Sequence, residues 1–150
     1  EKDRLGIREE VTVEATHHGP TALPCPITFV EIGSDDEAWL DTRLGQCVAQ
    51  AVARALTRDD RPPPNAIGVG GGHYSEKFTS LMLEGRYSLG HIIPKYALTG
   101  GMATEMFSRC IERTCGGVNV VVVDWKGTPS AYKENLKAFA ASLGIELVRV

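Results

Sequence analysis

Four histidines are the residues of this 150-residue sequence with the clearest capacity for chemistry. His17 and His18 precede a Gly-Pro pair, His73 follows three consecutive glycines, and His91 follows a single glycine. An imidazole titrates near neutrality, and its neutral ring binds metal ions. Any one histidine is more often structural than catalytic, but four in glycine- or proline-marked segments indicate a general base or a metal site.

Glu14 lies three residues before His17, close enough in sequence to orient an imidazole or to share a metal ion with it. The alternative is an exposed carboxylate on a strand, because a half-buried one is costly unless it is paired. His17 and His18 are neighbours, and neighbouring side chains of an extended chain point to opposite faces. They converge only if the chain bends between them.

The glycines Gly70, Gly71 and Gly72 follow a predicted strand and precede His73. Glycine permits positive φ and lets backbone N–H groups approach a ligand, although a tight structural turn would look the same. The sequence has no Walker loop and no Gly-x-Gly-x-x-Gly spacing, and it lacks a Gly-x-Ser-x-Gly elbow and a His-Glu-x-x-His motif. Serine nucleophiles and zinc-protease chemistry are therefore unsupported.

Alternating strands and helices must position these residues. Period-2 and β-branched patterns predict strands over Val11–Thr16, Ile27–Gly33, Ala66–Gly70, Tyr87–Ile93, Val118–Val123 and Glu146–Val150. Helical spacing and caps predict helices from a Ser34 cap to about Leu56, from Phe78 to near Gly85, from Met102 to Ile111, and from a Thr128 cap to Gly144. We expect one α/β domain over residues 1–150, with a mixed, largely parallel sheet and helices on both faces. Ligands of such sheets bind beyond the carboxyl ends of the strands.

Composition narrows the class of protein. A hydrophobic fraction of 43% and a charged fraction of 23% are ordinary for a globular chain, and the net charge of −3 argues against coating DNA electrostatically. No apolar run is long enough for a membrane span or a signal peptide, so we expect a cytoplasmic protein without a membrane partner. The four cysteines lack zinc-ribbon spacing and are expected to be reduced thiols.

Three ordered motifs resemble those of the archaeal/plant-type D-aminoacyl-tRNA deacylases. The first comprises EATHHGPT at residues 14–21 and FVEIGS at 29–34, the second GGGHY at 70–74 with KFT at 77–79, and the third GHIIPKYAL at 90–98. One departure is that Ser75 and Glu76 follow the second motif where a small residue and a proline are expected. Family members are also longer at the N-terminus, so we expect that a part found in them is missing here or naturally absent.

The resemblance implies hydrolysis of the ester between a D-amino acid and the 3′ end of tRNA, a proofreading step in translation quality control. It also implies a zinc-associated monomer. On this basis we predict that His17, His18 and His73 are catalytic and hold Zn²⁺, with Glu14 orienting them. The predicted substrate-binding residues are Gly70, Gly71, Gly72, Tyr74, Lys77, His91 and Lys95, and Arg86 is a further candidate contact for tRNA.

Two alternatives stay open at this point. One is another metal-assisted hydrolase, or a phosphorylase-like enzyme, acting on a small substrate. The other is a module that binds RNA ends without catalysis.

Overall fold

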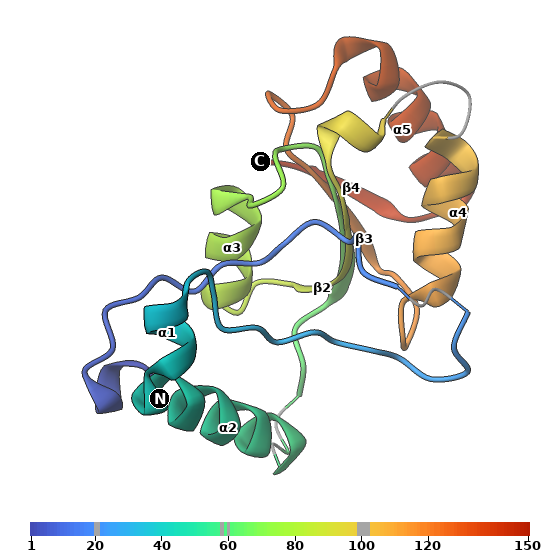
Figure 1. Ribbon diagram of the computed structural model, residues 1–150. Coiled ribbons are helices and arrows are strands. Elements are labelled where there is room, and N and C mark those ends of the chain that lie inside the picture. The colour runs from blue at the N-terminus through green and yellow to red at the C-terminus, as the bar shows by residue number, and fades with distance from the viewer. Residues whose placement is uncertain (20–21, 58, 60, 99–102) are drawn as a thin grey trace. The chain divides into compact units, whose positions relative to one another are not determined.

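The computed structural model describes residues 1–19, 22–57, 59, 61–98 and 103–150 (Figure 1). These residues group into two compact units, each described by itself below. The larger unit comprises residues 11–26 and 62–150, and the smaller comprises residues 1–10 and 27–61. Pro20 and Thr21 of the first motif, and the predicted helix start at Met102, lie outside the described residues. The prediction of one domain over residues 1–150 stays a prediction.

The larger unit is built on a four-stranded parallel sheet with the strand order β2-β1-β3-β4. Its strands are β1 (Asn65–Val69), β2 (Ser88–Ile93), β3 (Val120–Val123) and β4 (Glu146–Arg149). Each coincides, within one or two residues, with a strand predicted from β-branched runs. The α/β fold class is therefore confirmed.

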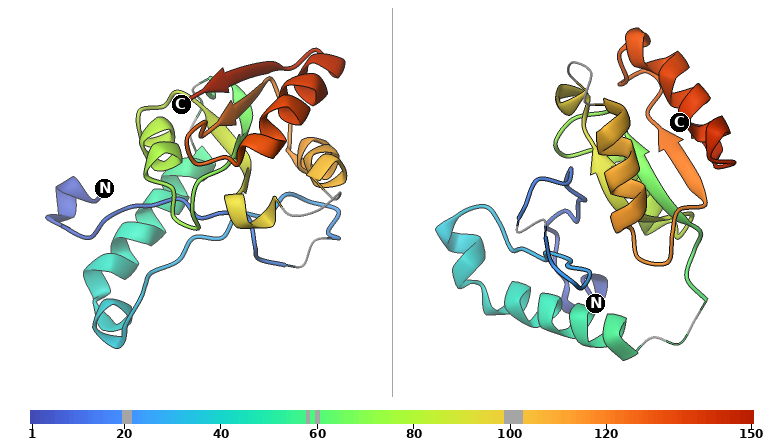
Figure 2. Two further views of the ribbon diagram at one scale, coloured as in Figure 1. Left: turned by 90° about the horizontal axis from the view of Figure 1, so that it is seen from above. Right: turned by 90° about the vertical axis from the view of Figure 1, so that its right-hand side faces the viewer.

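Helices cover both faces of this sheet (Figure 1; Figure 2). They are α3 (Glu76–Leu83) on one face and α4 (Ala103–Arg113) and α5 (Ser130–Ser142) on the other, with a short 3₁₀ turn η2 (Lys95–Ala97) after β2. The valines of β3 explain why this strand reads as continuously apolar. Val121 and Val123 pack into the core under α4 and α5, whereas Val120 and Val122 pack toward α3.

The predicted strand Val11–Thr16 is wrong as a regular strand. It forms a single isolated bridge, between Glu14 and Tyr74. The segment nevertheless reaches the open edge of β2, because Thr16 N–H donates to Ile92 O at 2.9 Å and Ile92 N–H donates to the Thr16 hydroxyl oxygen at 3.0 Å. The alternating pattern thus marks a segment that protects a sheet edge at two points instead of extending the ladder.

The smaller unit contains η1 (Asp3–Leu5), α1 (Asp36–Leu40) and α2 (Thr42–Thr57). The strand predicted over Ile27–Gly33 is wrong, since these residues form no ladder within the described part of the unit and an extended run needs a partner strand. Of the residues on α2, Leu44 alone is buried, so most of the predicted apolar stripe lies at the surface of this unit.

The predicted single helix with a Ser34 cap is also wrong. Asp35 caps α1 through its carboxylate, which accepts from Ala38 N–H at 2.9 Å. Asp41 then adopts an extended conformation, and its carboxylate accepts from Arg43 N–H at 2.8 Å. An aspartate that bonds the backbone two residues ahead ends one helix and starts the next.

Two further caps follow their local chemistry. Ser75 is the N-cap of α3 and accepts from Phe78 N–H, so the departure after the second motif still starts a helix cleanly. Thr128 does not cap α5 as predicted, because its hydroxyl donates to Asp124 O at 2.8 Å.

All four cysteines are free thiols, and every helix among the described residues is too short or too polar to span a lipid bilayer.

Candidate functional site

The parallel sheet brings segments that are far apart in sequence to one rim. His73 lies in the loop that follows β1, and Tyr96 lies on η2 directly after β2. Because β1 and β2 are parallel neighbours, their carboxyl ends meet at the same edge. Ala15 N–H donates to His73 O at 2.8 Å, which ties the segment carrying Glu14 and His17 to that loop.

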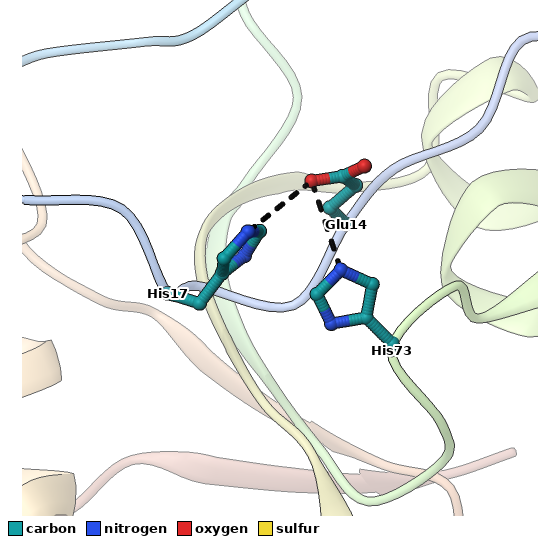
Figure 3. Close-up of side chains that lie close together, drawn as sticks. All are labelled: Glu14, His17 and His73. Atoms are coloured by element: carbon teal, nitrogen blue, oxygen red, sulfur yellow. Dashed lines mark ion pairs between the residues drawn. The ribbon is translucent and has the colours of Figure 1, made fainter. Parts of the chain in front are cut away.

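Three imidazoles surround one carboxylate oxygen at this rim. Glu14 Oε2 lies 3.7 Å from His17 Nε2, 3.9 Å from His18 Nε2 and 3.9 Å from His73 Nε2. Figure 3 shows His17, on the same chain segment as Glu14, and His73, on the loop after β1, both pointing toward the Glu14 carboxylate. The ring centroids of His17 and His18 are 4.0 Å apart, so the chain does bend between these neighbours. We refer to Glu14, His17, His18 and His73 as the histidine cluster.

Hydrogen bonds at the far ring nitrogens direct the near ones inward. His17 Nδ1 lies 2.7 Å from Ala15 O, and a carbonyl only accepts, so Nδ1 carries the proton and Nε2 keeps its lone pair. His73 Nδ1 lies 3.0 Å from the Tyr96 hydroxyl. Partners of this kind fix the ring orientation of metal-binding and catalytic histidines.

The donors of the cluster fit a zinc ion. One ligand atom each from Glu14, His17 and His73 lies within 4.8 Å of the others. Zinc–nitrogen bonds of about 2.0–2.1 Å give a tetrahedral edge of about 3.3–3.4 Å. The observed separations of 3.7–3.9 Å from Glu14 exceed that edge by about 0.3–0.6 Å, a distance that side-chain rotation can close. The side chains are 31–39% exposed, so a ligand can reach them from solvent.

The glycine loop is a tightly packed support for the cluster. Gly70 has φ +99°, and a Cβ there would lie 2.2 Å from Thr128 Oγ1. Gly70 N–H donates to Ile93 O at 2.8 Å, and Gly71 N–H, also at positive φ, donates to Gly127 O at 3.4 Å. The first two glycines are therefore bonded within the fold. Of the three glycines, this leaves Gly72, which is half-buried, as the candidate contact for a ligand.

The other predicted contact residues differ in their surroundings. Lys77 Nζ bonds Asp124 Oδ1 at 2.5 Å and Val150 O at 3.0 Å, so its charge is already matched. Lys95 is exposed on η2 beside Tyr96. Tyr74 is exposed and packs edge-on to His73 with 4.7 Å between ring centroids.

His91 does not join the cluster. It lies on β2 on the face toward α4, and its Nδ1 lies 3.0 Å from Thr114 Oγ1. Because the Thr114 hydroxyl donates to Cys110 O at 2.7 Å, it accepts from His91 Nδ1–H. Burial lowers the pKa of this imidazole below its usual value. These contacts give His91 a structural setting behind the rim.

Tyr96 is a site residue that sequence reasoning did not single out. Its signal was its position in the third motif, two residues after the proline that ends β2. Nothing in the spacing of residues 73 and 96 showed that their side chains meet.

The fold and the histidine cluster define the class of protein, an α/β protein whose sheet rim gathers imidazoles around one carboxylate. The family model described as D-aminoacyl-tRNA deacylase matches residues 3–148. This chain therefore belongs to the D-aminoacyl-tRNA deacylase family, and the resemblance of the three motifs is confirmed.

Similar proteins agree on the family and the fold. The D-aminoacyl-tRNA deacylase of Thermococcus onnurineus is 40% identical over 140 residues, covering 93% of this chain and 51% of that protein. The protein of the same name from Cenarchaeum symbiosum is 44% identical over 113 residues, covering 75% and 43%. A crystal structure described as a conserved protein of unknown function has a TM-score of 0.86 at 32% identity, covering 99% of this chain and 52% of that one. The chain spans about half the length of the curated relatives it matches.

Proposed function

We propose that this chain hydrolyses the ester bond of D-aminoacyl-tRNA and releases free D-amino acid and tRNA. The observation that carries the proposal is the convergence of three Nε2 atoms on Glu14 Oε2, in a chain of the deacylase family. We further propose that it works as a monomer in the cytoplasm, proofreading mischarged tRNA, with no DNA partner.

The reaction needs a positioned water molecule and a place for its proton. The aminoacyl ester is already activated, so orientation and charge stabilisation account for most of the required acceleration. His17 Nε2 keeps its lone pair because Nδ1–H donates to Ala15 O. It can accept the proton of a water whose oxygen attacks the ester carbonyl carbon. The ester bond then breaks, and the same proton passes to the departing 3′ oxygen of tRNA.

Glu14 stabilises the imidazolium formed in this step, because its carboxylate oxygen lies 3.7 Å from His17 Nε2. Tyr96 holds His73 through Nδ1, which keeps the second imidazole directed at the same point. Lys95 is exposed next to Tyr96 in the sequence, which supports a role for it as a contact to a phosphate of the substrate.

Zinc is the cofactor that we propose for this site. His17, His73 and Glu14 would hold it, with His18 as the remaining donor near Glu14. The general-base role of His17 described above belongs to the metal-free site, because the lone pair of its Nε2 cannot both bind a metal ion and accept a proton. A bound zinc ion supplies a Lewis acid that polarises a carbonyl oxygen or acidifies water. Metal binding also requires the histidines in their neutral form, and in neutral His17 the Ala15 contact selects the tautomer whose Nε2 faces Glu14 with its lone pair.

The test is the release of amino acid from D-tyrosyl-tRNA and L-tyrosyl-tRNA, each with added zinc and with a chelator. We expect release from the D-substrate, loss of that release in His17→Ala, and near wild-type release in the control His91→Gln, which lies outside the cluster. Binding of tRNA without ester cleavage under any condition would instead identify a module for RNA ends. Cleavage of small esters with no preference for aminoacyl-tRNA would indicate a different hydrolase.

A further inference from the structure

Three cations surround a single tryptophan next to the sheet rim. The centroid of the Trp125 ring lies 4.3 Å from Arg149 Cζ, 5.0 Å from Lys133 Nζ and 5.4 Å from Lys137 Nζ. Arg149 is the last residue of β4, and the two lysines lie on α5. We refer to these four residues as the tryptophan cluster. Cation–π attraction to the indole ring holds the charged groups together.

The tryptophan cluster and the histidine cluster lie on the same edge of the sheet. Trp125 follows Asp124, directly beyond the carboxyl end of β3, and His73 lies in the loop beyond β1. The two loops touch, since Gly71 N–H donates to Gly127 O at 3.4 Å. A ligand that extends along this rim from one cluster therefore reaches the other.

The charge at the tryptophan cluster opposes that of the whole chain. The chain has a formal net charge of −3. The cluster has three cations, Lys126 is adjacent in sequence, and Glu134 bonds Lys137 at 2.6 Å. Among the described residues, neither Lys133 nor Arg149 forms an ion pair with a carboxylate, whereas Lys137 does. Two cations beside a tryptophan thus lack a matching anion.

We propose that the tryptophan cluster binds the phosphodiester backbone of tRNA while its 3′ end lies at the histidine cluster. The inference rests on the proposed function, because that function places the tRNA end on this rim. Guanidinium and ammonium groups are the usual partners of RNA phosphates, and such contacts position the nucleic acid without reading its sequence. Trp125 preorganises the cations, which reduces the entropy lost when a phosphate is bound.

The test is the affinity of the full chain for uncharged, fluorescently labelled tRNA, measured by anisotropy at several salt concentrations. The patch variant is Lys133→Gln with Arg149→Gln. The control is Arg43→Gln with Arg109→Gln, which removes two exposed arginines that already pair with carboxylates.

Two lost phosphate contacts should reduce the slope of log affinity against log salt by about 1.4, and the affinity by about 25-fold at about 0.1 M salt. We expect the control to bind like wild type. Unchanged affinity in the patch variant, or an equal loss in the control, overturns the inference. The inference is also overturned if the wild-type chain binds poly-glutamate as tightly as tRNA, because the cluster would then be a surface for acidic peptides.

Each variant is checked by its thermal melt. If the double variant melts below the assay temperature, Lys133→Gln and Arg149→Gln are measured singly, and each should lose about fivefold. This binding assay needs no catalysis. A chain that binds tRNA through the cluster but never releases amino acid contradicts the proposed function alone. Release of D-amino acid with patch-independent tRNA binding contradicts this inference alone.

Discussion

Replacing Tyr96 with phenylalanine tests whether the histidine cluster is a preorganised metal site. The hydroxyl of Tyr96 lies 3.0 Å from His73 Nδ1, on the side of the ring opposite to the nitrogen that faces Glu14. Tyr96→Phe removes this contact and leaves the aromatic ring in place. His73 then keeps its position in the chain but loses the partner that orients its imidazole.

The expected loss follows from the exposure of the two residues. Removing a hydrogen-bond partner of a metal-binding histidine costs about 10- to 100-fold in metal affinity. The Tyr96 side chain is largely exposed and the His73 side chain is 35% exposed, so water can replace part of the lost bond. We therefore expect the lower end, about tenfold, which corresponds to about 1.4 kcal/mol. The unfolding free energy should change by less than about 0.5 kcal/mol, as at other surface positions.

The assay is a zinc titration against a chromophoric chelator, with Tyr132→Phe as the control. Tyr132 lies on α5, so its variant loses a tyrosine hydroxyl away from the histidine cluster. A zinc affinity of Tyr96→Phe equal to that of wild type refutes the reasoning, and so does an equal loss in Tyr132→Phe. If the wild-type chain does not compete with the chelator for zinc, the premise that the histidine cluster binds zinc is wrong.

Three further predictions concern the fold. Gly70→Ala should lower the unfolding free energy, measured in urea, by more than about 3 kcal/mol, because backbone strain at φ +99° adds to a collision with Thr128. Gly85→Ala is the control: its φ is +68° but no atom lies near the new Cβ, so it should cost about 1 kcal/mol. Burial lowers the pKa of His91 in the folded chain, so the unfolded chain binds more protons at mildly acidic pH. The unfolding free energy should therefore fall as the pH drops below about 6.5 toward the lowered pKa. His91→Gln should flatten the pH dependence of the urea midpoint over this range. Burial raises the pKa of the Cys110 thiol to about 11, so at pH 8 only about one Cys110 side chain in a thousand is a thiolate. A thiol reagent should therefore label Cys110 only after denaturation, whereas the exposed cysteines should react in the native protein.

The sequence predicted the sheet well where packing enforces one structure. The run Val120–Val123 is buried on both faces, and only a central strand between two helical layers satisfies that pattern. The run Ile27–Gly33 is equally β-branched and aromatic, yet Phe29 and Val30 are at least half exposed, and the described part of the chain has no regular strand over residues 27–33. Propensity was the same in both cases, and the presence of a partner strand decided the outcome.

The candidate site could be predicted in part. Histidines that follow parallel strands must gather at one rim, which brought His73 into the predicted set. His91 shares the same glycine-marked setting but lies within β2, so the alternation of the strand turns it toward Thr114. The roles predicted for Lys77 and for the glycine N–H groups ignored partners that only the tertiary fold provides, namely Asp124, Ile93 and Gly127.

The histidine cluster depends on hydrogen bonds that join segments distant in sequence. Glu14 and His73 are brought together because Ala15 N–H donates to His73 O, and Thr16 fastens the same segment to the edge of β2. The proposed zinc ion would draw the donor atoms of Glu14, His17 and His73 closer together, and would thereby add a further link between the two segments. Because such a site does not exist in the unfolded chain, zinc binding as proposed would stabilise the folded chain, by about 2.7 kcal/mol at a free zinc concentration 100 times the dissociation constant. Under this proposal the rim is the place where zinc binding and folding would be coupled, since one set of backbone contacts determines both the position of the donors and the closure of the sheet edge.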